Sequence, residues 1–175
     1  MKKNTQDQWQ QKLKDLDKVA DGLGLGIDAG VKETVALLNL AGVHTTASCE
    51  GHKNWGFPYP WIDIGRPDAW GIYKKLHKVK DFESKEFKDL TDQITKLNQP
   101  ECEKLFRLLK QFYPGNNTSA TAMLIISPFG HGAGRLESRQ EYIYESDKRA
   151  YARHARLAKA EMKRFTEFLK QQMLA

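Results

Sequence analysis

The segment Ser48–His52 holds the densest group of chemically active side chains in the sequence: a thiol, a carboxylate and an imidazole beside a glycine. It follows a β-branched, alternating run and precedes a loop rich in Asn, Gly and Pro, so it lies where a strand ends. Strand-end loops are where α/β folds place ligands. Gly51 lets the backbone turn sharply and present its amides to an anion. The sequence therefore predicts a ligand site here.

Three kinds of chemistry fit Cys49, Glu50 and His52. Cys49 can act as a nucleophile with His52 as its base, and either Glu50 or His52 can manage a proton. Alternatively, a zinc ion can be held by ligands drawn from His44, Cys49, His52 and His131. In a third interpretation the segment is a binding loop in which Cys49 only packs. A purely structural alternative also stays open, with a small buried cysteine and both Glu50 and His52 in solvent.

Further polar and aromatic residues are candidates for ligand binding. Tyr59–Trp61 forms an aromatic wall that can stack a base, although an ordinary core position also explains it. His131 and Arg135 lie on a glycine-rich loop that suits an anion clamp, but the loop has neither phosphate-loop nor dinucleotide-binding spacing. The complete set of predicted ligand-binding residues is Thr46, Ser48, Gly51, Trp61, Asp63, Arg66, His131 and Arg135.

The elements that must position these residues follow from the apolar spacing. The patterns predict helices over residues 1–22, 29–41, 69–80, 84–98 and from Pro100 onward, and strands over 43–48, 61–64, 121–129 and 135–138. Asp28 is expected to cap the second helix. The strand over 121–129 has the most apolar run and is expected to be buried. Together they predict an α/β fold in which residues 1–175 form a single domain, a small mixed sheet flanked by helices.

The last helix is expected to span residues 147–173 and to be amphipathic, with an apolar arc and a basic arc. Residues 146–175 contain eight Lys or Arg against three Asp or Glu, which accounts for most of the net charge of +6. A basic surface of this kind indicates an anionic partner such as RNA, and the alternative is a solvated helix face. The predicted nucleic-acid-binding residues are Arg149, Arg153, Arg156 and Lys163.

Composition excludes several classes of protein. The chain has 175 residues, of which 40% are hydrophobic and 29% charged, so collagen-like and wholly disordered classes do not fit. No apolar run approaches the roughly 18–20 residues of a membrane span. The first residues have no signal-peptide pattern, and two cysteines cannot form a disulfide framework. We therefore expect a cytoplasmic protein with reduced thiols and no membrane partner.

The stretch Asp28–Ile64 resembles the start of the wybutosine-synthesis tRNA methyltransferase family. It has an Asp, an amphipathic helix that ends near Asn39, and a strand that runs into the Ser-Cys-x-Gly frame of Ser48–Gly51. The sequence departs from the family pattern at Ala47, Glu50 and His52. The resemblance implies a small α/β domain, S-adenosylmethionine as methyl donor and an RNA substrate.

Three functional hypotheses follow. The first is an enzyme that modifies nucleic acids or nucleotides, in the form of an S-adenosylmethionine-dependent methyltransferase acting on RNA. In it Thr46 and Ser48 bind ligand, and Arg135 holds a carboxylate or phosphate. The second is a non-catalytic module that binds nucleic acid or an acidic partner through the last helix. The third is a metal-dependent hydrolase that uses the Cys49/His52 loop.

Overall fold

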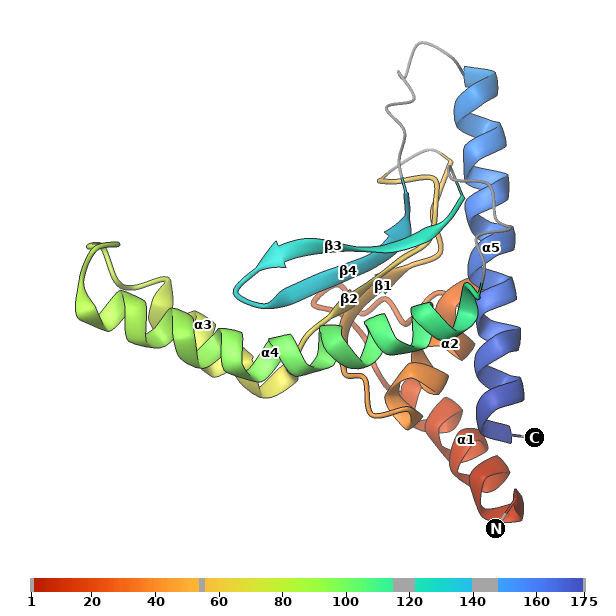
Figure 1. Cartoon of the computed structure of the whole chain (residues 1–175), viewed down its shortest axis with the longest axis horizontal. Coiled ribbons are helices and arrows are strands. Elements are labelled where there is room, and N and C mark those ends of the chain that lie inside the picture. Colours follow the sequence, from red (N-terminus) through yellow and green to blue (C-terminus); the bar gives the residue numbers. More distant parts are fainter. Residues whose placement is uncertain (1, 54–55, 115–121, 140–147, 175) are drawn as a thin grey trace.

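The computed structural model describes residues 2–53, 56–114, 122–139 and 148–174 (Figure 1). The helices are α1 (Lys2–Leu16), α2 (Ala29–Leu40), α3 (Trp70–Leu76), α4 (Lys85–Phe112) and α5 (Lys148–Leu174), with a 3₁₀ turn, η1, over Pro67–Ala69. The strands are β1 (Thr45–Cys49), β2 (Trp61–Ile64), β3 (Leu124–Gly130) and β4 (Ala133–Ser138).

The four strands form one sheet in the order β1-β2-β4-β3, and every neighbouring pair is antiparallel. The expected α/β class, with a small sheet, flanking helices and a long C-terminal helix, is confirmed. The described sheet is antiparallel throughout rather than mixed. Only His131 and Gly132 separate β3 from β4, and a hairpin this tight joins antiparallel strands, whereas residues 50–60 separate β1 from β2.

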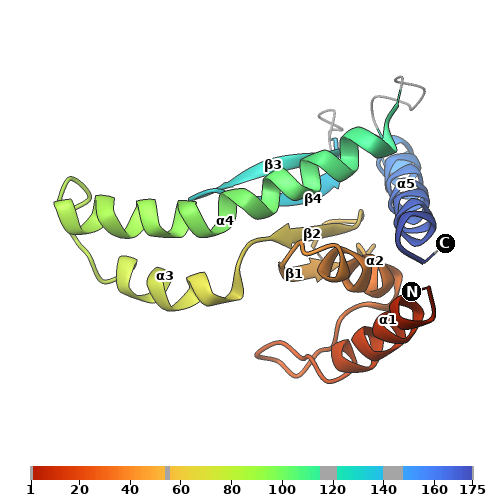
Figure 2. The ribbon, with the colours of Figure 1, turned by 60° about the horizontal axis from the view of Figure 1, so that its bottom comes forward.

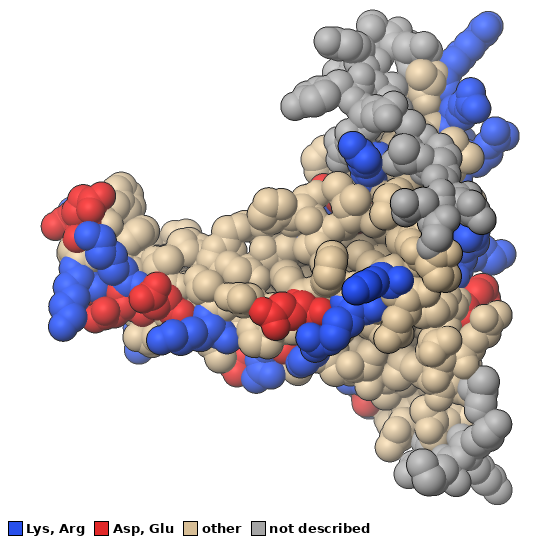
Figure 3. All heavy atoms as spheres, viewed as in Figure 1, with Lys and Arg blue, Asp and Glu red and all other residues tan. Residues whose placement is uncertain are grey.

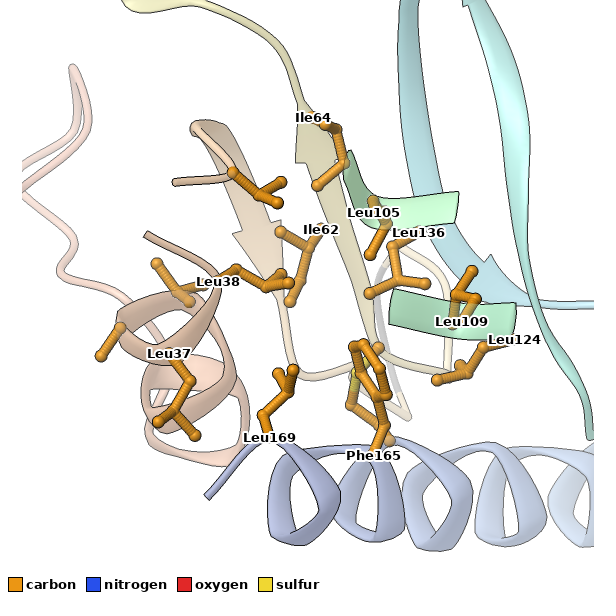
Figure 4. Close-up of a cluster of buried hydrophobic side chains, with 14 of the residues drawn as sticks. Leu37, Leu38, Ile62, Ile64, Leu105, Leu109, Leu124, Leu136, Phe165 and Leu169 are labelled. Atoms are coloured by element: carbon orange, nitrogen blue, oxygen red, sulfur yellow. The ribbon is translucent and has the colours of Figure 1, made fainter. Parts of the chain in front are cut away.

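The core lies on the face of the sheet that the helices cover. Ile62 and Ile64 of β2 and Leu136 of β4 alternate with polar residues and point to this face. There they meet side chains from α2, α4 and α5, among them Phe165 and Leu169 (Figure 4). Burying each large apolar side chain contributes about 1.5–3 kcal/mol relative to exposure. The helices therefore pack on one face of the sheet, and the polar residues of the strands lie on the opposite face.

The strand expected over residues 121–129 is shorter and less buried than predicted. β3 begins at Leu124, and Thr121 lies outside the described residues. Leu124 is buried, but the strand is exposed from Pro128 onward because it lies at the edge of the sheet. Pro128 has no backbone N–H to donate, which suits an edge strand. The prediction of a buried strand from this apolar run is therefore wrong beyond its first residues.

Two helices expected over 84–98 and from Pro100 form one helix, α4, with Pro100 inside it. The Ser84 hydroxyl caps its start by accepting from the Phe87 N–H at 3.1 Å. The helix continues through the proline because both halves are anchored. Ile94 packs with α3, and Leu105 packs in the main core. As Figure 2 shows, α3 and the first half of α4 form an arm that projects from the sheet.

The C-terminal helix α5 has the expected amphipathic character; residue 147 lies outside the described residues. Its buried face includes Met162, Phe165 and Leu169. Exposed basic side chains lie on its outward face, and Figure 3 shows Lys and Arg over the half of the helix nearer its start. Within the described residues, no helix combines the length and the apolar character needed to cross a membrane.

Candidate metal centre

The start of α2 and the end of β1 are joined by two carboxylates. The Glu50 N–H donates to the Asp28 carboxylate at 3.0 Å, and the Gly30 N–H donates to the Glu50 carboxylate at 2.7 Å. Asp28 was expected to cap α2 with its side chain, but it makes no such bond. Glu50 supplies that acceptor instead, and its negative charge suits a helix N-terminus. Asp28 is thereby free to face the Cys49–His52 turn.

Asp28, Cys49 and His52 bring three different ligand atoms together, all within 4.8 Å of one another. The His52 Nε2 atom lies 3.3 Å from a carboxylate oxygen of Asp28. Cys49 is buried, and the other two side chains are half-buried. Among the residues that the structure describes, this is the one group of three His, Cys, Asp or Glu side chains with such a geometry.

The arrangement disfavours a cysteine nucleophile. Burial raises the pKa of the Cys49 thiol, and the neighbouring Asp28 carboxylate raises it further. Asp28 contacts both the thiol and the imidazole. A nucleophilic pair needs the imidazole to take the thiol proton and leave a thiolate. A carboxylate, a thiol and an imidazole converging on one point are instead typical of a site for a divalent transition metal.

Gly51 is required at the turn that sets this geometry. Its φ is +82°, and a Cβ there would lie 2.5 Å from the carbonyl carbon of Pro58. The turn is also tied from two sides. The His52 N–H donates to Phe57 O at 3.0 Å, and Lys159 of α5 donates to Gly51 O at 2.7 Å. The prediction that Gly51 allows a sharp turn is confirmed by this geometry.

A cavity of about 410 Å³ reaches the candidate centre, with Asp28 and Cys49 in its wall. The predicted ligand-binding residues Thr46 and Ser48 also line it, together with Trp61. A small ligand in this cavity would therefore lie next to Asp28 and Cys49.

His44 and His131, the other predicted zinc ligands, lie elsewhere. The His44 N–H and its ring both contact the buried Glu101 carboxylate, at 2.8 and 3.0 Å. Burial alone would raise the pKa of Glu101, but hydrogen bonds from His44 and Lys104 outweigh it and lower the pKa. His131 lies at the β3–β4 turn against Tyr73. The structure brings Asp28 to Cys49 and His52 in their place.

The predicted anion-binding arginines have acidic partners. Arg135 makes two hydrogen bonds to Asp63, at 2.6 and 3.1 Å, and these bonds raise its pKa. Its guanidinium carbon also lies 4.0 Å from the centre of the Trp61 ring. Arg66 pairs in the same bidentate way with Asp68 at the surface. The Trp61 face expected to stack a base is therefore occupied by Arg135.

The predicted nucleic-acid-binding side chains Arg149, Arg153, Arg156 and Lys163 are all exposed on α5. Lys163 also lines a second cavity, of about 380 Å³, which includes Glu50 and Lys159. The lining of this cavity also includes Glu33 and Glu167, so the basic residues of α5 meet acidic residues beside the turn that carries His52.

Comparisons with protein-family models, curated proteins and solved structures return no match for this chain. The resemblance to the wybutosine-synthesis family stays a prediction, and the residues themselves carry the functional inference.

Proposed function

We propose that the protein is a metal-dependent hydrolase in which Asp28, Cys49 and His52 bind a divalent ion of the zinc type. The observation that supports this most strongly is the convergence of oxygen, sulfur and nitrogen donors within 4.8 Å, with two of the three side chains in a cavity wall. Zinc favours this donor set. Three protein ligands leave one of four tetrahedral positions open, which is typical of catalytic rather than structural zinc.

The chain supplies orientation around the proposed ion. The Glu50 N–H holds one Asp28 oxygen, and the Gly51 N–H contacts the Cys49 sulfur at 3.3 Å. Such outer contacts orient metal ligands and tune their basicity. A bound zinc ion supplies a Lewis acid and lowers the pKa of a coordinated water to about 7. Hydrolysis is therefore the reaction class that this donor set supports best.

The test is metal binding by the purified chain. The metal-free protein is loaded with Zn²⁺, and with Co²⁺ as a spectroscopic probe, and the bound metal is measured by elemental analysis. We expect one ion per chain and a near-ultraviolet thiolate–cobalt band that Cys49→Ser removes. Cys102→Ser is the matched control, because Cys102 is the second free cysteine and its thiol donates to Gly132 O. Metal binding that survives Cys49→Ser and His52→Ala unchanged would refute the proposal.

Nucleic-acid binding through α5 is the second candidate function. It is favoured by the exposure of Arg153, Arg156 and Lys163 on one helix. Salt-sensitive binding of RNA that falls when these side chains are neutralised would support it. The methyltransferase hypothesis also has a direct test, since S-adenosylmethionine should raise the unfolding temperature if it is the cofactor.

A further inference from the structure

A third and larger cavity, of about 730 Å³, lies where β2 leads into α3. This volume falls within the roughly 300–1,000 Å³ of small-ligand sites. The segments around it are the start of β1, the end of β2, α3, α4 and the β3–β4 hairpin. Apart from β1, none of these segments belongs to the proposed metal centre.

The floor of the cavity is held in place by Asn98, which is 1% exposed. Its amide oxygen accepts from the Arg66 N–H at 2.9 Å. Its amide nitrogen donates to His131 O at 3.2 Å and to the Tyr73 hydroxyl at 3.3 Å. One buried side chain therefore joins the end of β2, α3 and the hairpin turn.

Large aromatic side chains stand exposed around this cavity. Trp70 of α3 is 62% exposed and Phe129 of β3 is 58% exposed, and both line it. Arg135 lies over the Phe129 ring at 4.9 Å, and the Lys74 ammonium lies 6.0 Å from the centre of the Trp70 ring. Each ring therefore has a cation on one face and offers its other face for stacking. Tyr73 and His77 add two further rings from the same helix and its end. Flat aromatic ligands are the class that such walls select.

Basic side chains continue from the same helix. After Trp70, the exposed Lys and His residues on α3 and the turn that follows are Lys74, Lys75, His77, Lys78 and Lys80. Arg66 is in the cavity wall, paired with Asp68. Aromatic platforms interleaved with positive charge are the arrangement that binds single-stranded nucleic acid, where bases stack and phosphates meet cations.

We propose that this cavity holds an unpaired base of a single-stranded nucleic acid, stacked on Trp70 and Phe129, with the adjoining phosphates on the lysines of α3. Thr45, Thr46 and Ala47 line both this cavity and the one at the metal centre. Ala47 precedes Cys49 by two residues on β1, which is about 7 Å along a strand. A bound strand can therefore pass along β1 to the metal centre.

The substrate class then follows, and this step rests on the proposed function. The substrate is a phosphodiester of the bound strand. The oxygen of water forms a bond to phosphorus, one ester P–O bond breaks, and the departing oxygen takes a proton from the water. The second water proton is released from the new phosphate group.

Fluorescence anisotropy with a short, labelled single-stranded RNA tests the cavity. A chelator is present, so that metal plays no part in binding. We expect Trp70→Ala to bind about tenfold more weakly than the wild-type chain, since one lost base stack corresponds to roughly this factor. Phe106→Ala is the matched control. Phe106 is also 62% exposed, but it lies on α4 in the wall of a different cavity, and we expect no change.

Three results would overturn the base-binding cavity: equal affinity of Trp70→Ala and wild type, equal affinity for the matching duplex, or binding of free nucleoside monophosphates without binding of the strand. The two proposals fail separately. If RNA binding depends on Trp70 but no metal is bound, the hydrolase is wrong and the cavity stands. If metal is bound at Cys49 but RNA binding does not depend on Trp70, the cavity is wrong and the hydrolase stands.

Discussion

Asp28 and Glu50 each support the segment that carries the other: the Asp28 carboxylate accepts the Glu50 N–H, and the Glu50 carboxylate accepts the N–H of Gly30 in the first turn of α2. These two charge-assisted hydrogen bonds join the start of α2 to the end of β1. They also leave Asp28 facing Cys49 and His52. The candidate centre therefore lies at the N-terminus of α2.

Glu50 is expected to stabilise the fold by accepting the hydrogen bond at the N-terminus of α2. Glu50→Ala removes the acceptor for the Gly30 N–H and should cost about 1 kcal/mol of unfolding free energy. Glu50→Gln keeps an acceptor and should retain most of it, losing only the helix-dipole contribution of about 0.3–1 kcal/mol. Urea denaturation measures both variants. Equal losses in the two variants would show that the charge, rather than the hydrogen bond, is what matters.

Metal should stabilise the native chain through the three donors. At a Zn²⁺ concentration a hundred times the dissociation constant, the gain in unfolding free energy is about 2.7 kcal/mol. Thermal unfolding with and without Zn²⁺ should show this gain in the wild type and lose it in His52→Ala. His77→Ala, a change of an exposed histidine away from the centre, should keep it. A gain of the same size in His52→Ala would place the ion elsewhere.

Gly51 is expected to tolerate no side chain. Gly51→Ala places a methyl group 2.5 Å from backbone carbon at a positive φ, and both effects oppose folding. We expect a loss of at least about 2 kcal/mol, from strain and overpacking together. Gly22→Ala is the control, because a Cβ there meets no described atom within 4 Å. Chemical denaturation distinguishes the two, and similar small losses would contradict the assigned turn geometry.

His154 should make the fold sensitive to acid. It is 4% exposed, and neither ring nitrogen has a hydrogen-bond partner among the residues that the structure describes. Burial lowers its pKa below 6.5. Below that value the unfolded chain binds a proton that the folded chain does not, so stability falls as the pH falls and is unaffected above it. The limit is about 1.4 kcal/mol per pH unit.

The measurement for His154 is the unfolding free energy of wild type and His154→Phe across the acid range. The difference between them should shift in favour of the variant as the pH drops below 6.5 and stay constant above it. Parallel curves through the whole range would show that another group causes the acid response.

The basic face of α5 should act through charge alone. Neutralising Arg153, Arg156 and Lys163 to Gln should weaken RNA binding at low salt and flatten its dependence on salt concentration. For a single strand each lost phosphate contact changes the logarithmic slope by about 0.7. Trp70→Ala should leave that slope unchanged, because stacking releases no counterions. An unchanged slope in the α5 variant would remove this helix from the interface.

The local elements were predictable from sequence, and the long-range partners were not. The end of β1 at Ser48–His52 and the amphipathic α5 follow from alternation and helical spacing, which are local properties. Asp28 was identified as a helix cap and as the start of the family resemblance, but not as a metal ligand, because its side chain acts on residues more than twenty positions away. The pairing of His44 with Glu101 depends in the same way on a contact across 57 positions. Neither contact produces a periodic pattern in the sequence from which it could be predicted.

The contacts that form the candidate centre span very different distances along the sequence. Asp28 and His52 are 24 positions apart, whereas Lys159, which holds the carbonyl of Gly51, comes 108 positions after it. Contacts between near neighbours in sequence close early in folding, and distant ones late. We expect the donors to gather while the chain is still being made and α5 to dock afterwards. We therefore expect the three proposed metal ligands to come together before the last helix docks against them.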